Sequence, residues 1–127
     1  MKEVAEAAES LGIECCQEVL NRYETYIITD CREGLEYCRR VGSENVNLLL
    51  DTFHMNIEED NIPEAIRLAG RKLGHLHVGE SNRKLPGMGS LPWRDIGRAL
   101  RDIGYEKGVV MEPFLLQGGE VARDCKV

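Results

Sequence analysis

The sequence contains no apolar run that approaches the ~18 to 20 residues needed to cross a bilayer. Its first ten residues, MKEVAEAAES, lack the basic-then-apolar order of a signal peptide, so we expect a cytoplasmic protein. Lysine and arginine number 16 against 22 aspartates and glutamates, and the net charge of -6 argues against binding to nucleic acid. No GxGxxG or GK[ST] motif is present, so Gly87 and Gly89 are interpreted as turn residues rather than a phosphate cradle.

Paired cysteines of the zinc or redox type are also missing. The five cysteines are odd in number, two of them are adjacent, and none stand in a CxxC spacing. We therefore expect reduced thiols that fill space in the core. The cysteines are Cys15, Cys16, Cys31, Cys38 and Cys125.

What the sequence does contain is a regular alternation of helical and strand patterns, with no linker or change of composition. We predict a single α/β domain over residues 1–127, far short of the ~250 residues of a complete eight-stranded barrel. Expected helices cover 2–11, about 32–41, 63 to Gly70 or Gly74, and 92–103. Expected strands cover 13–20, 46–51, 73–79 and 108–114.

Each predicted strand carries one candidate metal ligand at or near its end. The intervals between these ligands are 33, 26 and 35 residues, about the length of a strand-plus-helix unit. Side chains two apart on a strand share a face, so the ligands face one way and apolar residues such as Leu50 and Leu76 face the other. The pattern indicates a cation at the carboxyl ends of parallel strands. The candidate ligands are Glu18, Asp51, His77 and Glu112.

Three carboxylates and one imidazole form a mixed oxygen and nitrogen donor set without thiolate. Such a set suits Mn²⁺, Co²⁺ or Mg²⁺ better than structural zinc, which prefers closely spaced Cys and His. His75, deeper on the same face, is interpreted as a hydrogen-bonded core histidine rather than a fifth ligand. Residues 58–60 are interpreted as a solvated loop or helix start, and Trp93 as an anchor for the helix that follows Pro92.

Four segments closely resemble the ketose 3-epimerases, the group that contains D-tagatose 3-epimerase and D-psicose (D-allulose) 3-epimerase. The resemblance extends from about Leu11 to Gly119, and its longest parts are free of gaps. The segments are EVLNRYE (18–24), LLLDTFHMNIEED (48–60), GHLHVGESNRKLPGMGSLPW (74–93) and VVMEPF (109–114).

The resemblance implies a (β/α)8 TIM barrel of which this chain supplies about the last four units, a half-barrel. It implies a metal-dependent isomerase that inverts C3 of a free ketohexose, D-fructose/D-psicose or D-tagatose/D-sorbose, through an enediolate. The metal ligands would be the four residues already singled out, and Glu18 and Glu112 would also act as acid and base on opposite faces of the sugar. Substrate-binding groups would be Glu24, His54 and Arg83.

Two other interpretations stay open at this stage. The chain could be a non-catalytic, metal-binding half-barrel that needs a missing amino-terminal half, and we expect it to form a homo-oligomer or to associate with that half. A metal-dependent phosphoesterase of the endonuclease IV type on the same barrel is disfavoured, because three histidines are too few for a His-rich multi-zinc site.

Overall fold

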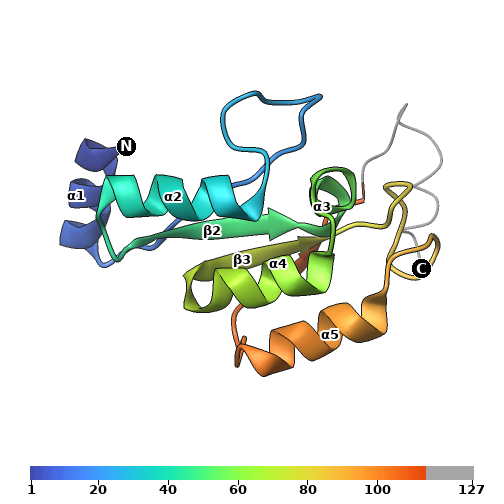
Figure 1. Cartoon of the computed structure of the whole chain (residues 1–127). Coiled ribbons are helices and arrows are strands. Elements are labelled where there is room, and N and C mark those ends of the chain that lie inside the picture. Colours follow the sequence, from blue (N-terminus) through green and yellow to red (C-terminus); the bar gives the residue numbers. More distant parts are fainter. Residues whose placement is uncertain (114–127) are drawn as a thin grey trace.

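Four parallel strands form one sheet in the order β1-β2-β3-β4, as seen in a computed structural model that describes residues 1–113 (Figure 1). Consecutive strands are neighbours throughout, which is the arrangement of successive strand-helix units in a barrel wall. The prediction of four units of such a barrel is confirmed. The strands are β1 (Cys15–Glu18), β2 (Val46–Asp51), β3 (Leu73–Val78) and β4 (Val109–Met111).

The helices alternate with these strands, and their ends follow the capping residues. Asp30 and Asn61 accept hydrogen bonds from the backbone N–H groups of Glu33 and Glu64 at the starts of α2 and α4. Gly42 ends α2 with a φ of 77°, which a residue with a Cβ rarely adopts. The helices are α1 (Lys2–Leu11), α2 (Cys31–Val41), α3 (Thr52–Glu58), α4 (Ile62–Ala69), the 3-10 turn η1 (Gly70–Lys72) and α5 (Trp93–Asp102).

The core lies between the sheet and the helices α2, α4 and α5, which lie over one face of it (Figure 1). Leu48, Leu50 and Leu76 point from the strands into this layer and are fully buried, as the alternation predicted, and Ile66 meets them from α4. Cys31 and Cys38 are buried free thiols on α2, whereas Cys125 lies outside the described residues. The opposite face of the sheet, which carries the candidate ligands, is left uncovered by these helices.

The structure corrects three details of the sequence prediction. Helix α3 was not expected, although its N-cap, Asp51, is the last residue of β2. Strand β1 is shorter than the predicted 13–20, because its ladder with β2 runs only from Cys15 to Glu18. Strand β4 ends at Met111, and position 114 of the predicted strand lies outside the described residues.

The two edges of the sheet are β1 and β4, and the apolar side chains of β4 are exposed. Val109, Val110 and Met111 are 51%, 46% and 61% exposed. No helix within residues 1–113 is long and apolar enough to cross a membrane.

Candidate metal centre

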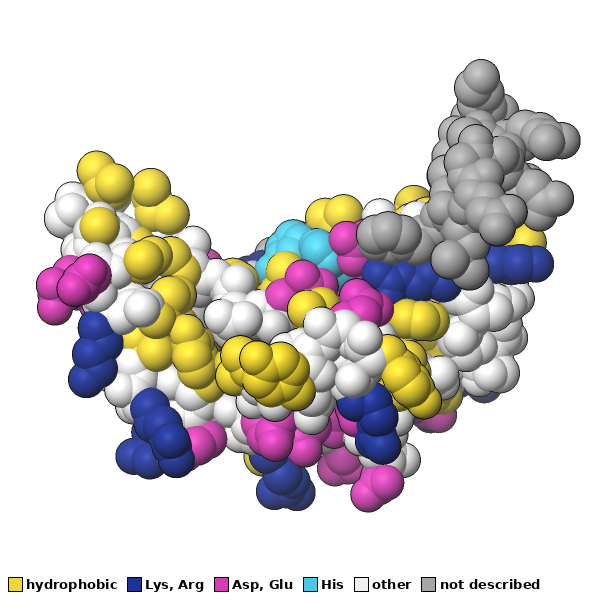
Figure 2. Space-filling view, turned by 90° about the horizontal axis from the view of Figure 1, so that it is seen from above, with side chains coloured by type: hydrophobic (Ala, Val, Ile, Leu, Met, Phe, Trp, Pro, Cys, Tyr) yellow, Lys and Arg dark blue, Asp and Glu magenta, His cyan; other side chains and the backbone are white. Residues whose placement is uncertain are grey.

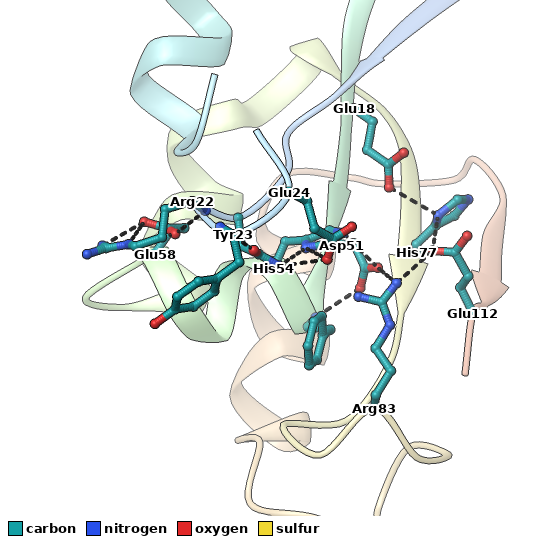
Figure 3. A network of polar contacts seen from close by, with 12 residues as sticks. Glu18, Arg22, Tyr23, Glu24, Asp51, His54, Glu58, His77, Arg83 and Glu112 are labelled. Atoms are coloured by element: carbon teal, nitrogen blue, oxygen red, sulfur yellow. Dashed lines mark hydrogen bonds and ion pairs between the residues drawn. The ribbon is translucent and has the colours of Figure 1, made fainter. Parts of the chain in front are cut away.

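The four predicted ligands meet at the carboxyl ends of the strands. One ligand atom from each of Glu18, Asp51, His77 and Glu112 lies within 4.8 Å of every other, although the residues come from four different strand ends. Figure 3 shows these side chains converging. In the space-filling view of Figure 2, histidine and acidic side chains gather in the hollow of this face.

Strand register explains the convergence. Asp51 pairs with His77 across β2 and β3, and His77 pairs with Val110, two residues before Glu112. Glu18 pairs with Leu49, two residues before Asp51. Because alternate residues share a face, all four ligands point to the same side of the sheet.

Asp51 is the most buried member of the site. Its side chain is 0% exposed. Oδ1 accepts a hydrogen bond from the backbone N–H of Phe53 at 2.9 Å and so caps α3. Oδ2 has no hydrogen-bond partner among the described residues, and burial raises the pKa of this carboxyl to about 6. A buried carboxylate oxygen left without a donor is costly unless a cation neutralises it, and a bound metal would supply that partner.

His77 lies between the two glutamates. Its Nδ1 is 3.1 Å from Oε2 of Glu112 and 3.7 Å from Oε1 of Glu18. Burial and the nearby Glu112 carboxylate raise the pKa of Glu18. Three carboxylates and one imidazole that converge on one point form an oxygen and nitrogen donor set that fits a divalent metal ion.

The three predicted substrate-binding residues surround the ligands. Nη2 of Arg83 lies 3.9 Å from Oδ2 of Asp51 and 3.7 Å from Oε2 of Glu112. Nε2 of His54 lies 3.9 Å from the same Asp51 oxygen. Glu24 lies on the far side of His54, with 3.8 Å between its Oε1 and the histidine Nδ1. The structure thus brings together all seven residues that the sequence placed in the site.

Arg83 reaches the site from the loop between β3 and α5. Its backbone has a φ of 63°, in the left-handed region that non-glycine residues seldom occupy. Its guanidinium carbon lies 4.1 Å from the centre of the Phe53 ring, a cation–π contact. A strained backbone at a residue aimed into a site is typical of a functional constraint.

Glu80 holds this loop in place, and the sequence did not single it out. Its carboxylate is fully buried and accepts four hydrogen bonds, from the indole N–H of Trp93 and the backbone N–H groups of Ser81, Gly87 and Leu91. Gly89 packs so closely that a Cβ there would collide with the carboxylate. Trp93 does anchor the start of α5, as predicted, and Glu80 is its partner.

Replacing Glu80 with glutamine is expected to destabilise the protein by about 2 to 3 kcal/mol, because the amide NH₂ would face two backbone or indole donors. Burial raises the pKa of Glu80, but its four hydrogen bonds outweigh burial and lower the pKa to about 2. Its stabilising contribution is therefore present above pH 4.5 and is lost as the pH falls towards 2.

Thermal unfolding between pH 2 and pH 7 measures this contribution. The gap between wild type and Glu80→Gln should be largest near neutral pH and should shrink in acid. Glu106→Gln, at an exposed position after α5, is the matched control and should unfold like the wild type. A gap that does not change with pH would contradict the assignment of an ionised, hydrogen-bonded Glu80.

The structure also tests the interpretations of His75 and of residues 58–60. His75 is not one of the four grouped residues, as expected, but it is half-buried rather than part of the core, and its side chain makes no hydrogen bond among the described residues. Its ring instead packs edge-to-face on His77 with 5.1 Å between centroids. Glu58 is not solvated, which corrects the interpretation of this residue, whereas Asp60 is exposed as expected. Its side chain is 5% exposed and binds the backbone N–H and the guanidinium of Arg22.

Comparison with known proteins gives matches over nearly the whole chain. Residues 1–124 match the family described as xylose isomerase-like TIM barrel. The chain is 56% identical to D-psicose 3-epimerase of Ruminiclostridium cellulolyticum over 127 residues, which are all of this chain and 43% of that protein. It is 40% identical to L-ribulose 3-epimerase of Mesorhizobium japonicum over 114 residues, or 90% of this chain and 38% of that protein.

Solved structures give the same result. A crystal structure of D-psicose 3-epimerase in the presence of D-fructose superposes with a TM-score of 0.89 and 52% sequence identity, over 99% of this chain and 44% of that one. A structure of L-ribulose 3-epimerase superposes with a TM-score of 0.88 and 36% identity, over 99% and 43% of the two chains. The resemblance to ketose 3-epimerases is confirmed, and the chain spans less than half the length of these relatives.

Proposed function

We propose that this chain, which belongs to the xylose isomerase-like TIM barrel family, forms the metal-binding carboxyl-terminal part of a ketose 3-epimerase. The observation that carries the proposal is the convergence of four ligand atoms within 4.8 Å, with Arg83 and His54 beside them. Relatives named D-psicose 3-epimerase and L-ribulose 3-epimerase supply the reaction class. We propose Mn²⁺ or Co²⁺ as the metal, with Mg²⁺ as a weaker candidate.

Glu18 and Glu112 are the proposed acid and base. Glu18 ends β1 and Glu112 follows β4, the two edge strands of the described sheet, and we propose that a sugar bound at this site presents one face of C3 to each carboxylate. One carboxylate removes the C3 proton, and the other carboxyl group returns a proton to the opposite face.

The other site residues bind and orient the sugar. His54 and Arg83 present N–H groups beside the ligands, where they would hold the oxygens on C1 and C2, and Glu24 would accept a hydrogen bond from a sugar hydroxyl. A divalent metal, when bound, lowers the free energy of the negative charge that develops on the sugar oxygens. Loss of the C3 proton beside the carbonyl gives the enediolate that epimerisation requires.

We also propose that the chain acts in association with further barrel strands. It covers 43% of the epimerase of R. cellulolyticum, and its edge strand β4 exposes Val109, Val110 and Met111. Unpaired edges of a parallel sheet favour pairing with another segment. The partner is either an amino-terminal half-barrel or a second copy of this chain. In the alternative function, the chain alone binds metal but turns over no sugar.

Isotope exchange tests the proposed reaction. The chain is joined to an amino-terminal half-barrel, loaded with Mn²⁺ and incubated with D-fructose in ²H₂O. We expect D-psicose with deuterium at C3, because each glutamate exchanges its proton with solvent between turnovers. D-Tagatose and D-sorbose form the second pair to test.

The outcomes separate the two functions. Epimer formation with complete retention of the C3 hydrogen over many turnovers would contradict the two-glutamate mechanism. Binding of one metal ion without any epimer, in the completed barrel as well as in the 127-residue chain, would favour the non-catalytic alternative.

A further inference from the structure

Asn21 occupies a buried position between two residues of the proposed sugar site. Its side chain is 1% exposed. Nδ2 lies 3.0 Å from Oε1 of Glu24 and 2.7 Å from Nδ1 of His54, and Oδ1 accepts the backbone N–H of Tyr23 at 2.9 Å. Neither the sequence patterns nor the proposed mechanism gives this residue a role.

The neighbours of Asn21 determine which way its amide points. The Glu24 carboxylate can only accept hydrogen bonds, so the atom facing it must be the NH₂ group. The backbone N–H of Tyr23 can only donate, so the atom facing it must be the carbonyl oxygen. Turning the amide over would create two repulsive contacts at once. The NH₂ group therefore also faces His54.

This orientation fixes the proton on His54. An NH₂ group donates, so Nδ1 of His54 must accept and carries no proton. A neutral imidazole has a single N–H, which must then be on Nε2, the nitrogen that faces Asp51. Nε2 is 3.9 Å from the Asp51 oxygen, too far for a hydrogen bond, so its N–H is directed into the site.

The segment that carries Asn21 is held against α3, which carries His54. Arg22 forms a bidentate ion pair with Glu58 at the end of α3, with Nη2 2.7 Å from Oε2, and its backbone N–H binds the same carboxylate (Figure 3). Asn21 itself accepts backbone hydrogen bonds from Glu24 and Thr25. The contact between Asn21 and His54 is therefore a fixed part of the site.

We infer that Asn21 is a positioning residue that holds His54 as the neutral Nε2–H tautomer, so that this histidine offers an N–H donor to an anionic or carbonyl oxygen of the substrate. The inference rests on the proposed function for the identity of that oxygen. The tautomer itself follows from the hydrogen bonds alone. A neutral donor stabilises negative charge on the substrate without giving up its own proton.

The tautomer is measured directly by ¹H–¹⁵N long-range correlation NMR of the metal-free chain labelled at histidine nitrogen. In the wild type at neutral pH, Nδ1 of His54 should give a pyridine-type signal and Nε2 a pyrrole-type signal. A protonated Nδ1 in the wild type would overturn the inference, whether or not any variant folds.

Asn21→Asp tests the cause, because it replaces the donor with an acceptor of the same shape. We expect Nδ1 of His54 to become protonated in this variant. Asn56→Asp adds the same charge at an exposed position on α3 and should leave the tautomer unchanged. An unprotonated Nδ1 in a folded Asn21→Asp variant would show that Asn21 does not control the tautomer.

Kinetics of the completed barrel link the tautomer to the reaction. Asn21→Asp should lower kcat by about 10- to 100-fold with a smaller change in KM, as expected when an orienting partner is lost. An unchanged kcat in a variant with protonated Nδ1 would refute the catalytic part of the inference. If the wild type has the expected tautomer but no epimerase activity, the proposed function is overturned and the tautomer assignment stands.

Discussion

Replacing Asp51 with asparagine is expected to weaken divalent-metal binding by more than about 100-fold and to leave the metal-free protein at least as stable as the wild type. Metal affinity should fall without a loss of stability, because Asp51 is a fully buried carboxylate whose Oδ2 has no hydrogen-bond partner among the described residues. Asparagine removes this buried charge and keeps an oxygen that can cap α3 through the N–H of Phe53.

Titration calorimetry with Mn²⁺ and thermal unfolding without metal measure the two effects. Asp95→Asn, on the exposed side of α5, carries the same chemical change and should alter neither metal affinity nor stability beyond about 0.5 kcal/mol. A variant that lost metal affinity and stability together would indicate a structural role for Asp51. Unchanged affinity would remove Asp51 from the ligand set.

Glu18→Gln and Glu112→Gln are each expected to reduce net epimerisation by about 10²- to 10⁴-fold. Each variant should still exchange the hydrogen on C3 with solvent, but in one of the two epimers only. Each glutamate faces one side of C3, so a variant that retains a single carboxylate can remove the proton from one epimer and return it to the same side. If one variant exchanges the C3 hydrogen of D-fructose, the other should exchange the C3 hydrogen of D-psicose.

Each sugar is incubated separately in ²H₂O with each variant of the completed, metal-loaded barrel, and deuterium at C3 is followed by NMR. Metal content is measured in parallel, because both glutamates are also proposed ligands; the amide oxygen of glutamine can still coordinate. Glu106→Gln serves as the control and should exchange and epimerise like the wild type. Exchange of both epimers by one single variant would require a proton acceptor other than these two glutamates.

The convergence of the four candidate ligands could be predicted from the sequence because their positions depend on local patterns. Each lies at or near the carboxyl end of a strand, and parallel neighbours bring strand ends together whatever the details of packing. The roles of Glu24, His54 and Arg83 came from the resemblance to a family rather than from spacing. All three nevertheless lie around the ligands in the structure.

The residues that the sequence missed depend on contacts between distant segments. In the sequence, Glu58 is one of three consecutive acidic residues. Its side chain is buried and paired only because Arg22, 36 positions away, packs against it in the fold. Asn21 and Glu80 are polar residues in loops, where solvent exposure is the usual expectation. Their hydrogen-bond partners in α3, in the loop that follows β3 and in α5 become neighbours only in the folded chain.

The sequential order of the strands has a consequence for folding kinetics. Each strand pairs with the next one along the chain, so every pairing closes a segment of roughly 30 residues and no step requires a longer loop. Glu18 and Glu112 nevertheless belong to the first and last strand ends, so the four ligand atoms can meet only after every pairing has formed. The rate of tight metal uptake during refolding would then report the docking of the last strand, whereas helix signals in circular dichroism would report the earlier steps.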